Sequence, residues 1–247
     1  MSRPELRLVL AVSLDGRLAP AEGGAAQIGG PGDRQVLQEA LAWADAVLVG
    51  AETLRLHGST CLIHRPQLLE QRRAAALPPQ PLAIVVSRSG AIPGDLPFFQ
   101  QPLERGLLLL DPSGFASLQP PGDRGLPPRL ESPRERDRPM PPTERSQVAP
   151  GFARQWACAD WTDALSQLKE AGVGRLAVLG GASLASSLLA ENLLDELQLT
   201  LCPRLLGGPH SWLGPTARVE LAGQSGWRLL EQRPLQGEEL LLRYRRA

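Results

Sequence analysis

Short apolar runs alternate with amphipathic stretches along most of this chain, and this alternation limits the possible folds more than any other feature. A short apolar run bounded by turn residues is typical of a buried strand, and apolar residues spaced three to four apart are typical of a helix. Strands that alternate with helices form α/β sheets. The expected strands lie in 6–19, 45–54, 81–90, 105–114, 175–181 and 196–208, and the expected helices in 32–44, 161–172 and 183–195.

The final segment, 218–247, has a different pattern. Its apolar runs are broken by Gly and Pro and have no helical stretch between them. Such runs indicate antiparallel strands. The predicted fold class is therefore α/β, with a mixed, mostly parallel central sheet flanked by helices and an antiparallel C-terminal edge.

Residues 111–150 interrupt this organisation. They hold ten of the 24 prolines of the chain, together with charges of both signs and very few apolar side chains. A segment of this composition cannot bury enough apolar surface to fold. We expect a long exposed and largely disordered insertion within a single domain that spans 1–247. The alternative is a docking segment, in which residues 129–138 contact an acidic partner.

Composition argues against several classes of partner. The chain has 26 Lys and Arg and 26 Asp and Glu, so its formal net charge is +0. This balance gives no reason to expect nucleic acid or an acidic membrane surface as a partner. The apolar run near the N-terminus is too short for a signal peptide or a membrane span. The three cysteines, Cys61, Cys158 and Cys202, are far apart and suggest free thiols in a reducing compartment. We expect a soluble, cytoplasmic protein.

A glycine pair, Gly180 and Gly181, stands between an expected strand and an expected helix. Glycine lets the backbone approach a ligand closely, and the first N–H groups of a helix form an anion site. Ser183 is placed to cap this helix or to donate from its hydroxyl. The pair lacks the spacing of the dinucleotide fingerprint and of the P-loop, so a structural tight turn remains the alternative.

Two further strand ends carry residues that suit a nucleotide. Gly50 and Thr53 follow the strand in 45–54, and Ser87 and Arg88 follow the strand in 81–90. An arginine beside hydroxyl groups can hold a ribose 2′-phosphate, which favours NADP over NAD, although an ordinary exposed arginine is the simpler interpretation. The C-terminal ends of parallel strands meet in one crevice, so these strand ends together favour a nucleotide site.

The stretch SLDG at 13–16 ends the first strand. An Asp-Gly pair is a strong turn signal, and a tight turn is one interpretation. The other places Ser13 and Asp15 beside a ligand.

Four of these stretches occur in an order that resembles a known family. They are LAVSLDGRLA, DAVLVGAETL, the strand, glycine pair and helix at 178–191, and DELQLTLCPRLLGG. In this order they resemble the C-terminal reductase domain of bifunctional riboflavin deaminase-reductases, which has the dihydrofolate-reductase-like fold. The resemblance extends from about Leu6 to Tyr244, apart from 111–150. The zinc-binding motifs of the deaminase half are absent from the sequence, so deamination is not implied.

The resemblance implies NADPH as the cofactor and places its contacts. Val12, Ser13, Gly50 and Thr53 would line the nicotinamide and ribose, and Ser87 and Arg88 would lie near the adenosine. The pyrophosphate would be held by Gly180, Gly181, Ala182, Ser183 and Leu184.

The positions that the family uses for its substrate match poorly. The residues found there instead are Ala25, Leu41, His57, His64 and Leu179. The basic residue after SLDG is retained as Arg17, and Arg65 neighbours a lost arginine. Sugar and phosphate recognition depends on charge-assisted hydrogen bonds, so these replacements put the family substrate in question.

The resemblance implies reduction of a ribosylaminopyrimidine phosphate in riboflavin biosynthesis, with hydride transfer to C1′ of the opened ribose. Asp15 and Arg17 are the expected polar groups on the substrate side. His57 is a candidate proton donor, with an exposed loop histidine as the alternative, and the histidines lack the spacing of metal ligands. The alternative functions are a reductase of the same fold with another heterocyclic or carbonyl substrate and a non-catalytic nucleotide-binding protein. The apolar C-terminal strands permit a homodimer.

Overall fold

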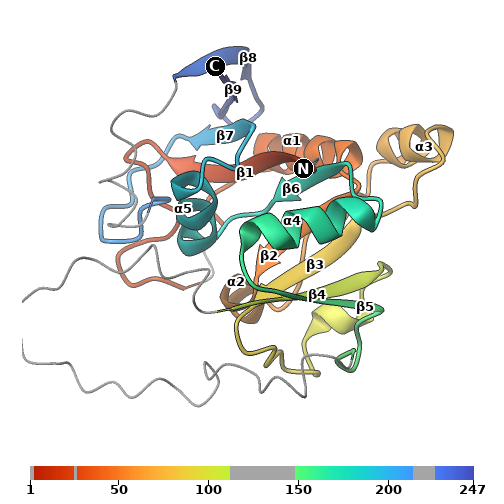
Figure 1. Ribbon diagram of the computed structural model, residues 1–247. Helices are drawn as coiled ribbons and strands as arrows, with labels where there is room; N and C mark the ends of the chain where they lie inside the picture. The colour runs from red at the N-terminus through yellow and green to blue at the C-terminus, as the bar shows by residue number, and fades with distance from the viewer. Residues whose placement is uncertain (1–2, 25–26, 112–147, 214–225) are drawn as a thin grey trace, which may run out of the picture.

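The computed structural model describes residues 3–24, 27–111, 148–213 and 226–247, and within them a nine-stranded sheet forms the centre of the molecule (Figure 1). The strand order is β5-β4-β3-β2-β6-β1-β7-β9-β8. The strands are β1 (Glu5–Ser13), β2 (Ala46–Gly50), β3 (Leu82–Ser87), β4 (Arg105–Leu110), β5 (Arg154–Cys158), β6 (Arg175–Val178), β7 (Glu196–Cys202), β8 (Trp227–Pro234) and β9 (Leu240–Arg246).

The direction of the strands divides the sheet into two parts. The neighbouring strands from β5 to β7 are parallel, whereas β9 is antiparallel to both β7 and β8. This arrangement confirms the predicted α/β class with an antiparallel C-terminal edge. Residues 218–225, the start of the segment expected to form these edge strands, lie outside the described residues.

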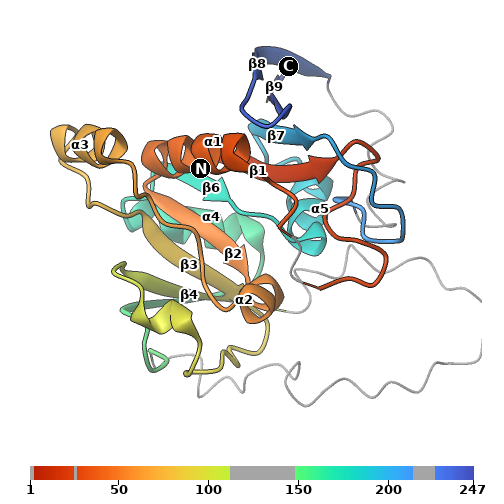
Figure 2. The same ribbon diagram turned by 180° about the vertical axis from the view of Figure 1, so that it is seen from behind.

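Helices cover both faces of the sheet. Helices α4 and α5 lie in front of it in Figure 1, and α1 lies in front of it in Figure 2, which shows the opposite side. The helices are α1 (Pro31–Trp43), α2 (Ala51–His57), α3 (Pro66–Ala74), α4 (Trp161–Glu170) and α5 (Ala182–Ala190), with a short 3₁₀ helix, η1 (Pro97–Gln100).

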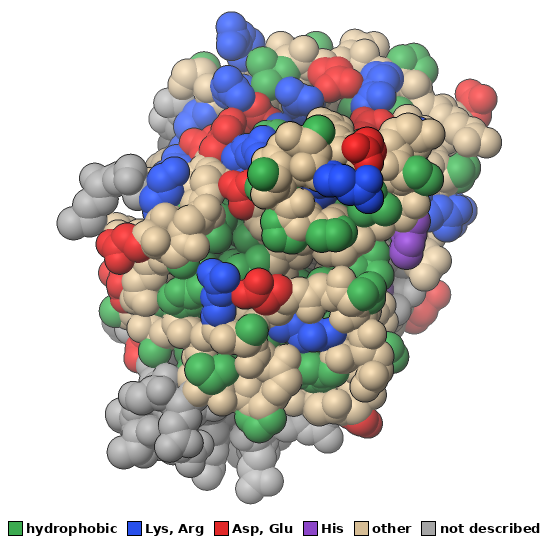
Figure 3. Space-filling view, turned by 90° about the vertical axis from the view of Figure 1, so that its right-hand side faces the viewer, with side chains coloured by type: hydrophobic (Ala, Val, Ile, Leu, Met, Phe, Trp, Pro, Cys, Tyr) green, Lys and Arg blue, Asp and Glu red, His purple; other side chains and the backbone are tan. Residues whose placement is uncertain are grey.

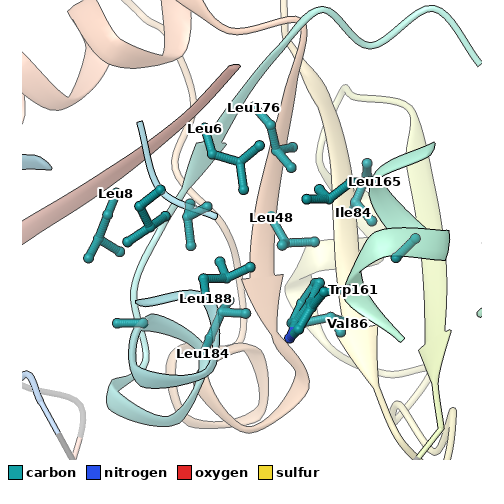
Figure 4. Close-up of a cluster of buried hydrophobic side chains, with 14 of the residues drawn as sticks. Leu6, Leu8, Leu48, Ile84, Val86, Trp161, Leu165, Leu176, Leu184 and Leu188 are labelled. Carbon is teal, nitrogen blue, oxygen red and sulfur yellow. The ribbon is translucent and has the colours of Figure 1, made fainter. Parts of the chain in front are cut away.

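Each face of the sheet has its own apolar layer, because side chains alternate between the two faces of a strand. On one face Leu8 and Leu48 pack with Leu188 of α5 and Trp161 of α4 (Figure 4). On the other face Val9 belongs to a second buried cluster together with residues of α1 and α2. Both layers consist mainly of side chains withdrawn from water, and this burial is the main stabilising contribution to the fold.

Side chains from distant segments cap both ends of α1. The N-cap residue of α1 is Gly30, which has no side chain to cap the helix. Instead the carboxylate of Glu239, between β8 and β9, accepts hydrogen bonds from the N–H groups of Gly30 and Asp33, the latter at 2.8 Å. At the other end the guanidinium of Arg72 donates to the carbonyl of Ala44 at 2.6 Å. A negative group at the N-terminus and a positive group at the C-terminus both complement the helix dipole.

Some predicted boundaries are wrong, and some elements were not predicted. The helix expected at 183–195 ends at Ala190, and the strand expected at 196–208 ends at Cys202, just before a proline. Helix α3 and strand β5 were not predicted. Residues 112–147, most of the expected insertion, lie outside the described residues.

Candidate active site

Four strand ends that carry predicted cofactor residues lie at one edge of the sheet. Strands β3, β2, β6 and β1 are consecutive and parallel, so Ser87, Gly50, Val178 and Ser13 end at the same edge. Ligands of open α/β sheets bind at this carboxyl edge. The structure therefore places the predicted strand ends side by side.

The glycine pair after β6 lies close to Thr53 of α2 and to Leu10 of β1. Gly180 and Gly181 have φ values of +79° and +91°, a region that residues with a side chain rarely adopt. A Cβ atom on Gly181 would lie 2.9 Å from the hydroxyl oxygen of Thr53, and one on Gly180 would lie 2.9 Å from a methyl carbon of Leu10. Both positions therefore favour glycine for backbone conformation, and a Cβ atom at either would force its neighbour to shift.

The start of α5 differs from one expectation. Gly181 is the N-cap residue and no side chain caps the helix, so the prediction that Ser183 caps it is wrong. Ser183 is exposed in the first turn, and Ala182 is half-buried. Leu184 is buried in the core, so only its backbone faces the helix end. Anion binding by the first N–H groups of α5 stays a prediction.

The segment after β3 is ordered by its own serines and by α2. Ser87 is buried, and its hydroxyl accepts a hydrogen bond from the N–H of Gly90 at 2.9 Å. Arg88 is exposed. Arg55 of α2, which was not among the predicted site residues, donates to the carbonyl of Ala91 at 2.8 Å. The guanidinium groups of Arg88 and Arg55 thus both belong to the region predicted to hold the adenosine end of the cofactor.

The SLDG turn is held by the side chain of Asp15. Ser13, which like Val12 is buried, donates to Asp15 at 2.6 Å. The Asp15 carboxylate also accepts from the N–H groups of Leu206 and Gly207 at 3.1 and 2.8 Å. The Ser13 hydrogen bond and these two backbone hydrogen bonds lower the pKa of Asp15 to about 2. An ionised carboxylate of this kind holds a loop and is a poor proton donor at neutral pH.

Arg17 and His57, the two other predicted catalytic residues, make few contacts with the rest of the protein. The Nε atom of Arg17 lies 3.7 Å from the Asp15 carboxylate, and its side chain is 28% exposed. His57 is exposed at the C-terminal end of α2, and its ring has no hydrogen bond or ion pair within the described part of the chain. Their catalytic roles stay predictions.

The residues that replace the family's substrate contacts differ in their exposure and contacts. Leu41 is fully buried in α1, and Leu179 is half-buried after β6. The backbone N–H of His64 donates to the side chain of Gln38 at 2.7 Å. Ala25 lies outside the described residues.

Arg65, the neighbour of a lost arginine, is paired. Its guanidinium lies 3.7 Å from the carboxylate of Glu39. Glu39 in turn pairs with Arg233 at 2.6 Å. Arg65 thus belongs to a network that joins α1, α3 and the C-terminal strands.

Asp33 is a functional candidate that was not among the predicted site residues. It is the third residue of α1, and Thr200 on β7 is one of the groups that lower the pKa of its carboxyl group. Burial is the largest contribution that raises the pKa of Asp33. Its unusual environment depends on β7 and Glu239, more than 160 residues away in the sequence, so no local pattern could have shown it.

Two cavities lie at the opposite edge of the sheet, where the strands begin. One, of about 540 Å³, is lined by Arg3, Glu5 and Asp195 among others. The other, of about 430 Å³, is lined by Asp45, Glu104 and other residues. Figure 3 views the molecule from the side on which β1 begins, and there positive and negative side chains are interspersed. These cavities are remote from the glycine pair and take no part in the candidate site.

Two kinds of feature were searched for in the described residues alone. Within them no helix combines the length and the apolar character that crossing a membrane requires. Within the same residues, no three His, Cys, Asp or Glu side chains come together in a way that could hold a metal ion.

Comparison with known proteins agrees with this geometry. A curated relative from Archaeoglobus fulgidus, named 2,5-diamino-6-ribosylamino-4(3H)-pyrimidinone 5′-phosphate reductase, is 26% identical over 209 residues, which are 85% of this chain and 84% of the relative. The structure of Acinetobacter baumannii RibD aligns with a TM-score of 0.73 and 23% identity, over 99% of this chain and 58% of that chain.

A dihydrofolate reductase from Enterococcus faecalis aligns with a TM-score of 0.50 and 13% identity over 98% of this chain and 96% of that chain, which agrees with the expected fold. Residues 4–110 and 134–229 match the family model described as the RibD C-terminal domain. This match covers most of the chain and confirms the resemblance drawn from the sequence motifs. The chain belongs to the RibD C-terminal domain family.

Proposed function

We propose that this protein is an NADPH-dependent reductase of a ribosylaminopyrimidine phosphate in riboflavin biosynthesis. The observation that carries the proposal is the glycine pair, which leaves the start of α5 open beside Thr53 and next to the end of β1. Membership of the RibD C-terminal domain family and the similarity to a named pyrimidinone phosphate reductase support the same reaction.

The residues at the glycine pair fit a nicotinamide dinucleotide. Gly180 and Gly181 have no side chains that would obstruct a pyrophosphate, and the uncapped N–H groups of α5 would bind it. Bound NADPH supplies a hydride for reduction of the substrate carbon. The protein's own contribution is to hold the two reactants in contact and to exclude water from them. Asp15 takes part by positioning the loop that follows β1.

Arg88 is proposed to select NADPH over NADH. Replacing Arg88 with alanine is expected to raise the KM for NADPH about tenfold, because a hydrogen bond to a charged group contributes about 1.5–3 kcal/mol. The KM for NADH should stay unchanged, since NADH lacks the 2′-phosphate. Steady-state kinetics with both cofactors measure the effect. Arg73→Ala is the control, since this exposed arginine of α3 lies outside the site, and equal losses in the two variants would contradict the role.

The reaction itself is tested by NADPH absorbance with the purified protein and the ribosylaminopyrimidine phosphate, in both its amino and its deaminated form. We expect consumption of NADPH that depends on the substrate. Protein that binds NADPH but turns over neither form would exclude this substrate class and leave a reductase with another substrate or a non-catalytic binder.

We also propose that the protein acts as a homodimer through its C-terminal strands. Leu197, Tyr244 and Leu229 are in register across β7, β9 and β8, so they share one face of the sheet. Leu229 is 46% exposed. Light scattering should give twice the mass of the chain, and Leu229→Arg should shift it toward one chain. A monomeric mass for the unaltered protein would contradict the proposal.

Finally, we infer a cytoplasmic protein whose residues 1–247 form one domain. All three cysteines are unpaired in the structure, as in a reducing compartment. Strands β4 and β5, from the two sides of the 111–150 segment, pair from Gly106 with Arg154 to Leu110 with Cys158. A segment whose flanking strands pair directly is an insertion within one domain.

A further inference from the structure

A partly exposed position lies in the middle of the sheet beside the glycine pair. In β1, Ala11 is half-buried although its neighbours Leu10 and Val12 are buried. The pairing of β1 with β6 ends at Leu8, so at Ala11 the strand is paired with β7 alone. Ala11 is in register with Thr200 of β7. The nearby Gln198 of β7 donates to the carbonyl of Val36 in α1, so alternate residues of β7 face α1. Solvent therefore reaches the α1 face of the sheet at Ala11.

Asp33 stands at this accessible position. Thr200, the partner of Ala11, acts on the carboxyl group of Asp33 and lowers its pKa. A Cβ atom on Gly29 would lie 2.1 Å from an oxygen of Asp33, so the lack of a side chain at Gly29 makes room for this carboxyl group. Asp33 itself is half-buried and thus accessible to a ligand over Ala11.

One carboxyl group, one guanidinium group and two thiols surround Asp33. The titratable and charged groups that face it are Glu239 from the β8–β9 connection, Arg34 of α1, Cys61 after α2 and Cys202 of β7. Burial is the largest contribution that raises the pKa of Asp33, and the charge of Glu239 adds to it. Thr200 and Arg34 lower the pKa.

We propose that Asp33 determines specificity by binding the ring edge of the substrate, and that it favours a pyrimidinone with an amino group over one with an oxo group at ring position 2. This inference rests on the proposed function and deepens it. The amino form presents two N–H donors at this edge, the amino group and the adjacent ring nitrogen. The two oxygens of a carboxylate accept both.

The oxo form presents a different edge. A carbonyl oxygen there replaces one donor with an acceptor, and a carboxylate oxygen opposite an acceptor is left unpaired and repelled. A site built to pair a substrate N–H rejects an analogue that lacks it, because its own polar group is then buried without a partner. Asp33→Asn provides one donor and one acceptor and so removes the preference.

The first test compares kcat/KM for the amino and deaminated substrates at pH 7.5. The unaltered protein should favour the amino form at least tenfold, and Asp33→Asn should bring the two within about threefold with the Kd for NADPH unchanged. Asp163→Asn is the matched control, because Asp163 is likewise the third residue of its helix, α4, and belongs to the other face of the sheet. It should keep the preference.

A second test measures the binding of two pyrimidine compounds in the absence of turnover. Calorimetry with 2,6-diaminopyrimidin-4-one and 6-aminouracil, which differ at position 2, should show tighter binding of the diamino compound to the NADPH-saturated protein. The preference should decline as the pH falls through the raised pKa of Asp33, because the protonated acid loses one acceptor. In Asp33→Asn the preference should be small and independent of pH.

The outcomes separate the two proposals. Turnover of both substrates with the same ratio in Asp33→Asn would overturn the role of Asp33 and leave the proposed function intact. Turnover of neither, with preferential binding of the diamino probe that Asp33→Asn abolishes, would reject the proposed substrate and retain the role of Asp33. Equal binding of both probes by the unaltered protein, or no binding of either, would overturn the role.

Discussion

Replacing Gly181 with alanine is expected to weaken NADPH binding at least tenfold, which corresponds to about 1.4 kcal/mol. A methyl group at this N-cap position, directly before the uncapped first turn of α5, would lie 2.9 Å from the Thr53 hydroxyl. The backbone would also be strained, because φ is +91° at Gly181. Fluorescence titration with NADPH measures the Kd, and a thermal melt reports the strain.

Gly172 offers a matched control for this substitution. It follows α4 with the same φ of +91°, but a Cβ atom there would meet nothing within 4 Å. Gly172→Ala should therefore lower the melting temperature through the same backbone strain, about 1–2 kcal/mol, and leave the Kd for NADPH within twofold. If both variants weakened NADPH binding equally, Gly181 would be a turn residue without a role in the cofactor site.

Replacing Glu196 with glutamine is expected to lower the free energy of unfolding by about 3–5 kcal/mol. Glu196 is fully buried at the start of β7, and its carboxylate lies 2.8 Å from Arg7, 2.6 Å from Arg245 and 3.5 Å from Arg243. Without this charge three neighbouring guanidinium groups lose their shared partner. Urea unfolding should show a lower midpoint with an unchanged slope.

An exposed ion pair in the same protein provides the comparison. Glu104 lies 2.7 Å from Arg154, and both side chains are almost half exposed, at 45% and 44%. Surface pairs contribute about 0–1 kcal/mol, so Glu104→Gln should change the unfolding midpoint very little. A loss for Glu196→Gln no greater than that for Glu104→Gln would show that burial does not strengthen the interactions of Glu196.

The fold was predictable where strand and helix patterns are strong and local. The apolar runs that became β1 to β4, β6 and β7 carry enough signal by themselves. Strand β5 was missed because Arg154, Gln155 and Trp156 in its first half lack the apolar run of a buried strand, and at the sheet edge they do not need one. Helix α3 was missed because it buries little beyond Arg72, so its sequence has a weak apolar stripe.

The candidate site, too, was predictable only where the signal in the sequence is local. The glycine pair was recognisable from sequence because its conformation and its place before a helix are local properties. Asp33 was not, since its environment is made by Thr200 and Glu239 from strands far along the chain. The capping role assigned to Ser183 failed because a chain in the left-handed region at Gly181 starts the helix before the serine.

The place of β1 between β6 and β7 has a consequence for how the chain assembles. Glu5 pairs with Arg175 and Arg7 with Glu196, so β1 waits for partners synthesised more than 160 residues later. Contacts of such long range slow folding and leave strand edges open to aggregation meanwhile. The site at the end of β1 thus comes together only late in biosynthesis, once β6 and β7 have been added on both sides of it.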